Sequence, residues 1–303
     1  MIFSRAALYF DEVARRGSVR RAAETLNIAA SAVDRQILLL EEHFGIALFE
    51  RLPQGLRLTA AGELLVGDLR RWRRDLAKAT ARIDDLRGLR RGEVSVALVE
   101  GAIELLAGGL RGFQADYPSI TYRLEVRGAE KVAEMVQSGE ADLGLAVNPP
   151  DSHSLRAERT LIYHLGAVVR PGHPLASRRE IAMADCAGYP LILPGETLSL
   201  RKVFDESWRR CVGSPPALPT VAGSVALIKG LIRSGFGIGM LTALDVRSEI
   251  AAGELAFLHF TDGKIPVSAL SLITASGRSL SGPAALLLRH LSAAMLREPA
   301  PAV

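Results

Sequence analysis

The chain has 303 residues, of which 49% are hydrophobic and 23% charged, and its net charge is +4. This length is too great for one compact core, so two or three domains are expected, and the composition excludes a disordered chain. Residues 1–91 hold 17 Lys and Arg against 12 Asp and Glu (+5), and the remainder holds 20 against 21 (−1). A polyanion would therefore meet the first third of the chain.

The two cysteines, Cys186 and Cys211, are too few for a disulfide framework, and no Cys/His spacing indicates a metal site. No run of 18 apolar residues occurs, and charged residues interrupt the apolar pattern of the N-terminus, which argues against a signal peptide or membrane span. We therefore expect a cytoplasmic protein without metal or cofactor. No catalytic constellation can be placed, so we expect no enzyme, and His173 in its His-Pro-Leu-Ala turn is interpreted as structural.

Residues 1–58 show the pattern of a small helical domain followed by a hairpin. Apolar residues at helical spacing predict helices over 4–16, 18–26 (with Ser18 as N-cap) and 30–44. Pro53-Gln54-Gly55 between two short apolar runs predicts the hairpin. Two helices joined by a tight turn and followed by a basic hairpin describe a winged helix-turn-helix domain, whose second helix enters the major groove of DNA.

The exposed face of the third predicted helix holds the candidates for base contacts. Arg35 is the strongest candidate, because a guanidinium can bind a guanine edge through two hydrogen bonds or hold a phosphate. The alternative is a solvated Arg35 paired with a nearby carboxylate. Arginines in the hairpin, or wing, can bind flanking phosphates or the minor groove. The residues predicted to lie at the DNA are Ser18, Ala30, Ser31, Asp34, Arg35, Gln36, Arg51 and Arg57.

The order and spacing of these residues resemble the LysR-type transcriptional regulators. The resemblance rests on Phe10-x-x-Val13, Gly17-Ser18, Ala22-Ala23-x-x-Leu26, Arg35-Gln36-Ile37-x-x-Leu40-Glu41, Gly45-x-x-Leu48-Phe49-x-Arg51 and Arg57-Leu58-Thr59-x-x-Gly62. The chain departs from the family in the recognition helix, where Ala29 cannot cap through its side chain and Ala30 lacks an amide. Asp34 adds a negative charge close to the phosphates. The resemblance therefore implies the docking pose but not the operator sequence.

Residues 59–90 predict one long helix with an apolar seam. The seam residues follow one another at intervals of 4, 3, 4, 3, 4 and 3: Leu65, Leu69, Trp72, Leu76, Ala79, Ile83 and Leu86. Such a seam must be buried, and the two-fold symmetry of most operators favours a second copy of the chain as its partner. The alternative is that the seam packs on its own head. We interpret the arginines of residues 70–74 as a solvated face, with Trp72 buried in the seam, and the family resemblance also implies a dimerisation helix.

Residues 91–303 alternate between strand and helix patterns, which predicts a parallel sheet between helices in each of two lobes. The expected strands are 94–99, 120–126, 142–147, 167–169, 190–193, 220–222 and 238–241, and the expected helices are 102–116, 129–138, 199–212 and 224–234. Two such lobes resemble the periplasmic solute-binding fold, which LysR-type regulators share.

The expected fold class is α/β overall, with three parts. These are a winged helix-turn-helix DNA-binding domain (1–58), a linker and dimerisation helix (59–90), and an effector-binding domain (91–303). Within the last, lobe I is expected at about 91–166 and 269–303, and lobe II at about 167–268.

In open α/β sheets, ligands lie beyond the carboxyl ends of strands and at helix N-termini. This rule selects as effector-binding candidates Glu100, Gly101, Ala102, Gly128, Ala129, Thr197, Ser199 and Ser224. In the family, the position around Gly101 is often Ser or Thr and contacts an effector carboxylate. Here Gly101 has no hydroxyl, and Glu100 and Glu104 bring negative charge, so we expect a neutral or cationic effector. The alternative is that these glutamates point into solvent.

The sequence thus indicates a ligand-responsive transcriptional regulator. Its expected partners are double-stranded DNA with two-fold-related half-sites, a small-molecule effector, and one or three further copies of itself in a homodimer or homotetramer. We expect no membrane partner. Two alternatives stay open: a DNA-binding regulator whose cleft is vestigial and ligand-independent, and a solute-binding carrier protein, against which the winged head argues.

Overall fold

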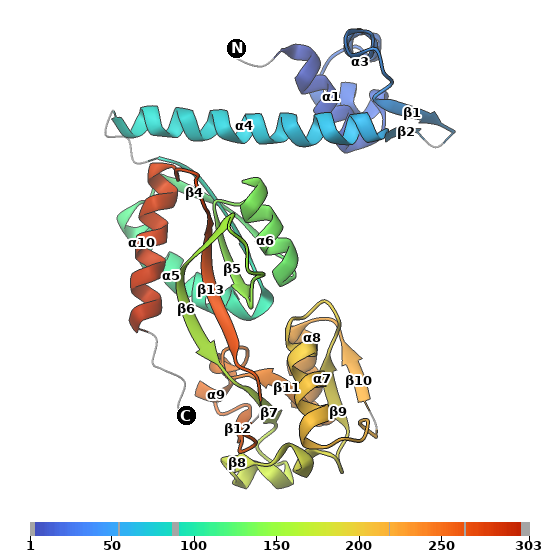
Figure 1. Ribbon diagram of the computed structural model, residues 1–303. Coiled ribbons are helices and arrows are strands. Elements are labelled where there is room, and N and C mark those ends of the chain that lie inside the picture. Colours follow the sequence, from blue (N-terminus) through green and yellow to red (C-terminus); the bar gives the residue numbers. More distant parts are fainter. Residues whose placement is uncertain (1–3, 54, 87–90, 218, 264, 298–303) are drawn as a thin grey trace. The chain divides into compact units, whose positions relative to one another are not determined.

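The computed structural model describes residues 4–53, 55–86, 91–217, 219–263 and 265–297 (Figure 1). The chain divides into two compact units, Met1–Thr80 and Ala81–Val303. Each unit has its own hydrophobic core, so each is described by itself.

The first unit contains every element that the sequence predicts for the head. They are α1 (Arg5–Arg16), α2 (Val19–Leu26), α3 (Ala30–Phe44), β1 (Phe49–Leu52), β2 (Gly55–Leu58) and the start of α4 (Ala60–Leu86). β1 and β2 pair antiparallel as the wing.

Local chemistry explains where the head's helices begin and end. The Ser18 hydroxyl accepts a hydrogen bond from the Arg21 amide at 3.4 Å, which confirms Ser18 as the N-cap of α2. Gly17 (φ 64°) ends α1 and Asn27 (φ 54°) ends α2, both in the left-handed conformation that glycine and asparagine adopt most readily. Ala29 precedes α3 without a side-chain cap, as expected.

A small apolar core and one carboxylate fix the wing against α3. The rings of Phe10 and Phe49 lie with centroids 5.2 Å apart, and Val33 of α3 is fully buried beside them. Oε1 of Glu41 accepts hydrogen bonds from the amides of Leu48 (2.7 Å) and Phe49 (3.1 Å). The Glu41 carboxylate therefore fixes the start of the first wing strand against α3.

The apolar seam of α4 has two different environments in the single chain. Leu69 is buried in the head core, whereas Trp72 is 48% exposed and Ile83 is 53% exposed. The half-buried seam residues are Leu65, Leu76 and Ala79. The side chain of Leu86 and the predicted end of the linker, residues 87–90, lie outside the described part of the chain. The N-terminal part of the seam thus packs on the head of the same chain, as the alternative stated. Trp72 was expected to be buried in the seam, but it is exposed in the single chain.

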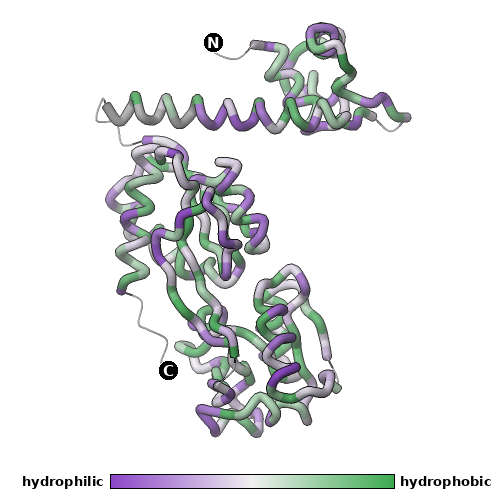
Figure 2. The backbone as a smooth tube through the Cα atoms, in the orientation of Figure 1, coloured by the Kyte–Doolittle hydropathy of each residue, from purple (hydrophilic) through white to green (hydrophobic). Residues whose placement is uncertain are grey.

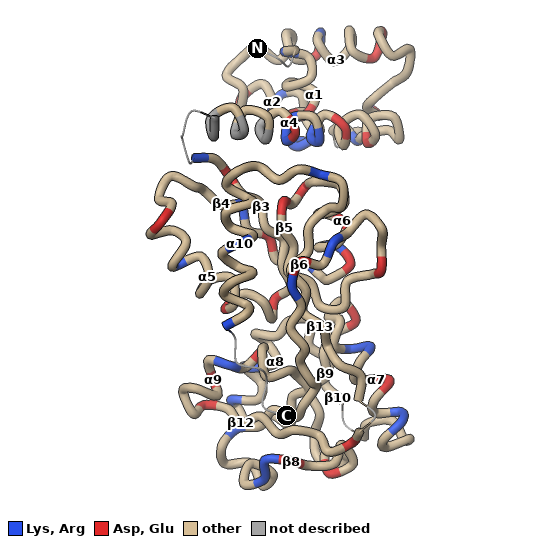
Figure 3. The backbone as a smooth tube through the Cα atoms, turned by 60° about the vertical axis from the view of Figure 1, so that its left-hand side comes forward, with Lys and Arg blue, Asp and Glu red and all other residues tan. Residues whose placement is uncertain are grey.

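The basic run beside the seam is tied to the head by ion pairs. Asp11 of α1 contacts Arg70 through Oδ1 (2.8 Å) and Arg73 through Oδ2 (2.7 Å). Basic residues gather on this part of α4 (Figure 3), and the helix is hydrophilic along the same stretch (Figure 2). The side chains of Arg70, Arg71 and Arg73 stay about half exposed, so the interpretation of this run as a solvated face is confirmed for these three, whereas Arg74 is partly buried.

The second unit begins with lobe I, a five-stranded sheet with helices on both faces (Figure 1). Its elements are β3 (Gly92–Leu98), α5 (Ile103–Asp116), β4 (Ile120–Val126), α6 (Ala129–Ser138), β5 (Leu143–Val147), β6 (Leu155–Tyr163), β13 (Ser268–Ala275) and α10 (Gly282–Arg297). The strand order is β4-β3-β5-β13-β6. β3, β4 and β5 are parallel, but β13 runs antiparallel to both β5 and β6, so the prediction of a parallel sheet is wrong for this edge.

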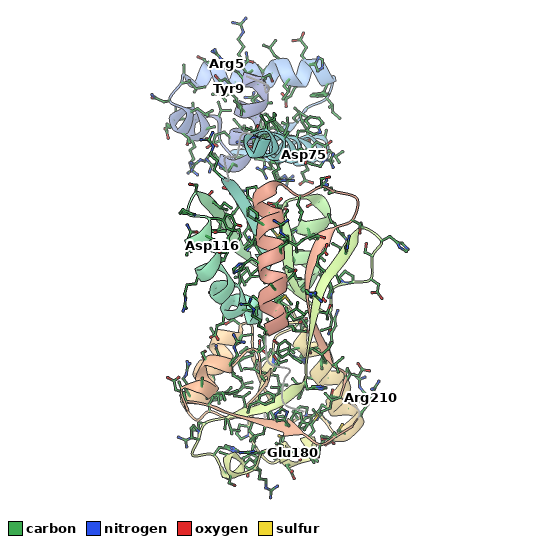
Figure 4. The ribbon with its side chains drawn as sticks, turned by 90° about the vertical axis from the view of Figure 1, so that its left-hand side faces the viewer. Arg5, Tyr9, Asp75, Asp116, Glu180 and Arg210 are labelled. Carbon is green, nitrogen blue, oxygen red and sulfur yellow. The ribbon has the colours of Figure 1, made fainter. Side chains whose placement is uncertain are left out.

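Alternating strand residues of lobe I supply two cores. Val96 and Leu98 of β3 pack on the face covered by α5 and α10, which lie alongside each other (Figure 4). Ala97, between them in sequence, packs with Val132 and Val136 of α6 on the other face. β3 is buried on both faces only from Val96 to Leu98, and there its residues are apolar on both sides, whereas the exposed Glu93 and the half-buried Ser95 precede this stretch.

Lobe II repeats the α/β arrangement around a six-stranded sheet of order β10-β9-β11-β7-β12-β8. Its elements are β7 (Leu165–Val169), β8 (Glu180–Ile181), β9 (Leu191–Pro194), α7 (Leu200–Cys211), β10 (Pro219–Ala222), α8 (Val225–Arg233), β11 (Ile238–Thr242), α9 (Arg247–Ala251) and β12 (Ala256–Phe260). β9, β10 and β11 are parallel, whereas β7 is antiparallel to β11 and β12, so this sheet is mixed as well.

The chain crosses between the two lobes at β6–β7 and again at β12–β13. A third connection comes from the loop after β11, in which Leu244 packs in the core of lobe I and Val246 in that of lobe II. None of the helices in the described ranges combines the length and apolar character needed to cross a membrane.

Candidate functional site

Two surfaces of the chain hold the predicted site residues, the first being the α3–wing face of the head. Ser31, Arg35, Arg51 and Arg57 are exposed there, and the half-buried members of the predicted set are Ser18, Ala30, Asp34 and Gln36. Within the described residues, Arg35 has neither an ion pair nor a side-chain hydrogen bond. The alternative of an Arg35 held by a nearby carboxylate is therefore wrong for this structure.

Both wing arginines are paired with acids. Nη2 of Arg51 lies 3.1 Å from Oδ1 of Asp34, which joins the wing to the recognition helix. Nη2 of Arg57 lies 2.6 Å from Oε2 of Glu50, on the opposite strand of the wing. Exposed ion pairs of this kind contribute only about 0–1 kcal/mol, so a phosphate can replace either carboxylate at little cost.

The second surface is a cavity of about 220 Å³ in the second unit, between the two lobes. The predicted effector residues that line it are Glu100, Gly101, Gly128, Ala129, Thr197 and Ser199. Ala102 is fully buried, and Ser224 does not line the cavity because its hydroxyl caps α8, accepting from the Leu227 amide at 3.1 Å. The rule for ligands in α/β folds thus located the cavity, but the prediction of these two residues as its lining is wrong.

Glu100 of lobe I reaches across this cavity to lobe II. Its Oε2 accepts from the Val225 amide at 2.9 Å, and its Oε1 accepts from the Ala226 amide at 2.8 Å. These are the first two residues of α8, where the helix dipole and open N–H groups favour a negative charge. Glu104 makes a second crossing, since its Oε1 accepts from the Ser248 hydroxyl at 2.5 Å. The alternative that both glutamates point into solvent is wrong.

Asp245, which the sequence analysis missed, completes the acidic side of the cavity. Its Oδ2 accepts from the amide (2.8 Å) and the hydroxyl (2.7 Å) of Thr242. Burial raises the pKa of Asp245 above its ordinary value, against the lowering effect of the Thr242 hydrogen bonds. A Cβ on Gly101 would lie 2.3 Å from Oδ1 of Asp245, so the carboxyl group occupies the space that a serine or threonine side chain would need.

Other lining residues give the cavity hydroxyls and apolar walls. Ser268 is 1% exposed, and its Oγ has no hydrogen-bond partner among the described residues. Ser199 precedes α7, and Gly128 precedes α6, without a side-chain cap in either place. The apolar walls come from Val99, Val126, Val147, Tyr163, Leu198 and Leu244. The cavity suits a small molecule with an apolar body and few polar groups.

The missed residues had different signals in the sequence. Thr242 and Asp245 follow the carboxyl end of a predicted strand, so the rule applied elsewhere would have found them. Tyr163 and Ser268 lie where antiparallel strands cross between the lobes, which no local pattern predicted.

The described residues hold no group of three His, Cys, Asp or Glu arranged for a metal ion. Burial raises the pKa of the Cys186 thiol to about 12.

Comparisons with known families match nearly the whole chain. Residues 4–63 match the family described as bacterial regulatory helix-turn-helix protein, lysR family. Residues 87–296 match the LysR substrate binding domain. The two matches correspond to the two surfaces described above.

Relatives and solved structures agree with these matches. The chain is 33% identical to the HTH-type transcriptional regulator CbbR of Xanthobacter flavus, over 80% of this chain and 73% of that protein. It is 30% identical to a RuBisCO operon transcriptional regulator of Acidithiobacillus ferrooxidans, over 82% of this chain and 80% of that protein. Full-length CbnR, solved with its target DNA, has the same fold, with a TM-score of 0.71 and 23% identity over 96% of this chain and 99% of that one.

The buried Asp245 predicts a pH-dependent stability. Because its folded pKa lies above the unfolded value, the folded state holds the proton more tightly, and stability falls as pH rises towards the folded pKa. Each pKa unit by which the folded value exceeds the unfolded one lowers the free energy of unfolding above the folded pKa by about 1.4 kcal/mol. Asp245→Asn keeps an acceptor for Thr242 but carries no charge, so its melting temperature should exceed that of the wild type by a growing margin as the pH is raised from about 4, the ordinary pKa of an aspartate, towards the folded pKa.

The control is Asp151→Asn, which changes an exposed aspartate. Thermal melts of the three proteins across this range measure the effect. A constant difference between Asp245→Asn and wild type at all pH values would show that Asp245 keeps its charge in the folded protein.

Proposed function

Because the chain belongs to the LysR family of bacterial transcriptional regulators, we propose that its head docks on duplex DNA through the α3–wing face and that its interlobe cavity binds the effector. The presence of a regulatory helix-turn-helix match and a substrate-binding match in one chain carries this proposal. Its relatives are named transcriptional regulators, so neither an enzyme nor a solute-binding carrier has support from them. We place its action on chromosomal DNA in the cytoplasm, without cofactor.

The proposed division of labour follows the three parts of the sequence. Residues 1–58 bind DNA, 59–90 pair two copies of the chain, and 91–303 bind the effector. Lobe I is assigned to about 91–166 and 269–303, and lobe II to about 167–268. A ligand between the lobes would shift the equilibrium between two arrangements of the protein, and with it the presentation of the two heads.

The DNA contact is assigned to the N-terminal half of α3 and to the wing. Arg35, exposed and without an acidic partner, is free to bind a base edge or a phosphate. Asp34 competes with a phosphate for Nη2 of Arg51, the only atom of this guanidinium group that it contacts. Asp34 therefore weakens the phosphate grip of the wing, and it also repels the backbone directly.

Two substitutions test this assignment in opposite directions. Arg35→Ala should weaken binding to an operator selected from random duplexes by about 1–3 kcal/mol, because a side chain at the base edge is lost. Asp34→Asn should strengthen binding and steepen its salt dependence, because a negative charge that opposes the phosphates is removed. Fluorescence anisotropy over a salt series measures both effects.

Arg209→Ala, which removes an exposed arginine of lobe II, is the control. Unchanged operator affinity of Arg35→Ala at physiological salt would contradict the docking face.

We also propose that the open end of the α4 seam is covered by a second copy of the chain. Trp72 and Ile83 are large apolar residues about half exposed in the single chain, on the side that the heptad spacing aligns. Leu76, Ala79 and Leu86 belong to the same seam by spacing, whereas Leu65 and Leu69 serve the head core. Pairing two chains here gives the two heads that a two-fold-related operator requires, in a dimer or in a tetramer built from dimers.

A lysine in the seam tests this pairing. Ile83→Lys should shift the protein towards monomer in light scattering after size exclusion, because a buried charge without a partner is strongly unfavourable. Leu64→Lys changes an exposed leucine of α4 (74% exposed) that lies off the seam, and it should leave the mass unchanged. If Ile83→Lys keeps the wild-type mass and Leu64→Lys does not, the seam assignment is wrong.

The effector itself is proposed to be neutral or cationic. The carboxyl groups of Glu100 and Asp245 border the cavity, and hydroxyls of Thr197, Ser199 and Ser268 supply its other polar groups. An anionic group beside the Glu100 carboxylate would meet repulsion.

A ligand panel in a thermal-shift assay tests the charge of the effector. The compounds that raise the melting temperature should be found among neutral molecules and amines small enough for a cavity of about 220 Å³. A ligand that binds only the folded protein stabilises it by mass action. A result in which carboxylates alone stabilise the protein would contradict the assignment. Identical DNA footprints with and without every stabilising compound would favour the ligand-independent alternative.

A further inference from the structure

We propose that Glu100 is an internal ligand of the cleft: its carboxylate occupies the anion-binding position at the N-terminus of α8 and so determines which charge the cleft accepts. The inference rests on the proposed effector function of the cavity and specifies what selects the effector. It makes Glu100 a specificity-determining residue and not merely a wall of the cavity.

The geometry at α8 is that of a bound carboxylate. Both oxygens of Glu100 are used, one on the Val225 amide (2.9 Å) and one on the Ala226 amide (2.8 Å). The Ser224 hydroxyl accepts a hydrogen bond from the Leu227 amide, so the first three N–H groups of this nine-residue helix all have acceptors. A free anion arriving at α8 would find its donors already in use.

Glu100 belongs to lobe I and α8 to lobe II, and Glu100 lies 125 residues before Val225 in sequence. The carboxylate therefore reaches the helix from a separate part of the fold, as the carboxylate of a bound ligand would. Glu100 lies in the short turn after β3, and the neighbouring Glu104 makes a separate contact between the lobes through the Ser248 hydroxyl. A tethered group competes at an effective concentration of the order of millimolar or higher, so a free carboxylate of ordinary affinity cannot displace it. Glu100 therefore also holds the lobes together while the cavity is empty.

An independent feature points to a ligand in the remaining space. Ser268 is almost completely buried, yet its Oγ has no partner among the described residues, and the residue lines the cavity. A buried hydroxyl without a partner is costly, so a molecule that pairs with it gains affinity. The cavity of about 220 Å³ remains open beside Glu100, so the effector binds next to this carboxylate and does not replace it.

The proposal predicts a gain of anion binding when the carboxylate is removed. Full-length Glu100→Thr leaves the α8 amides open, so millimolar sodium acetate, with sodium chloride at equal ionic strength as reference, should raise its melting temperature. In calorimetry, acetate should bind this variant at least about tenfold more tightly than the wild type. Glu104→Gln is the matched control, because it changes the adjacent glutamate, whose partner is a side-chain hydroxyl.

Glu100→Gln provides a second variant should Glu100→Thr fail to fold. Its side chain has nearly the same shape but one acceptor oxygen and no charge, so its response to acetate should lie between those of wild type and Glu100→Thr. Equal responses to acetate in wild type and in the folded Glu100 variants would overturn the proposal. A wild type that binds no effector, combined with an acetate response in Glu100→Thr, would contradict the proposed function while supporting the internal ligand.

Discussion

The hydrogen bonds between the Glu100 carboxylate and the first amides of α8 connect the two lobes at the point where an effector would act. A charge-assisted bond to a helix N-terminus is among the stronger polar contacts available to a protein, and here it uses both oxygens. Gly101 and Asp245 fit around it, because the missing side chain of one makes room for the carboxyl group of the other. The acidic character of the cavity is therefore built into its packing.

This arrangement limits what an effector can do. A ligand shifts a conformational equilibrium only by its different affinity for the two states, and the interlobe contact through Glu100 already stabilises one of them. An effector that binds beside Glu100 and Ser268 would add to that stability, whereas one that displaces Glu100 would oppose it. The same contact thus sets both the preferred charge of the effector and the direction of its effect.

The sequence predicted the elements better than it predicted their partners. Ser18, Gly17 and Asn27 mark helix ends through local chemistry, so the head was predicted accurately. The mixed sheets were not, because the crossing strands β6, β7 and β13 pair with segments far away in sequence, and an apolar run does not reveal strand direction. Likewise, Glu100 was recognised as a charge near the cleft, but its partner 125 residues away depends on how the lobes pack.

Amide hydrogen exchange at Val225 and Ala226 tests most directly whether Glu100 acts as the ligand of α8. Both amides donate to this carboxylate and to no helical carbonyl, since they open the helix. They should be protected in the wild type, exchange much faster in Glu100→Ala, and regain protection when acetate is added to that variant. Equal exchange of these two amides in wild type and Glu100→Ala would contradict the account.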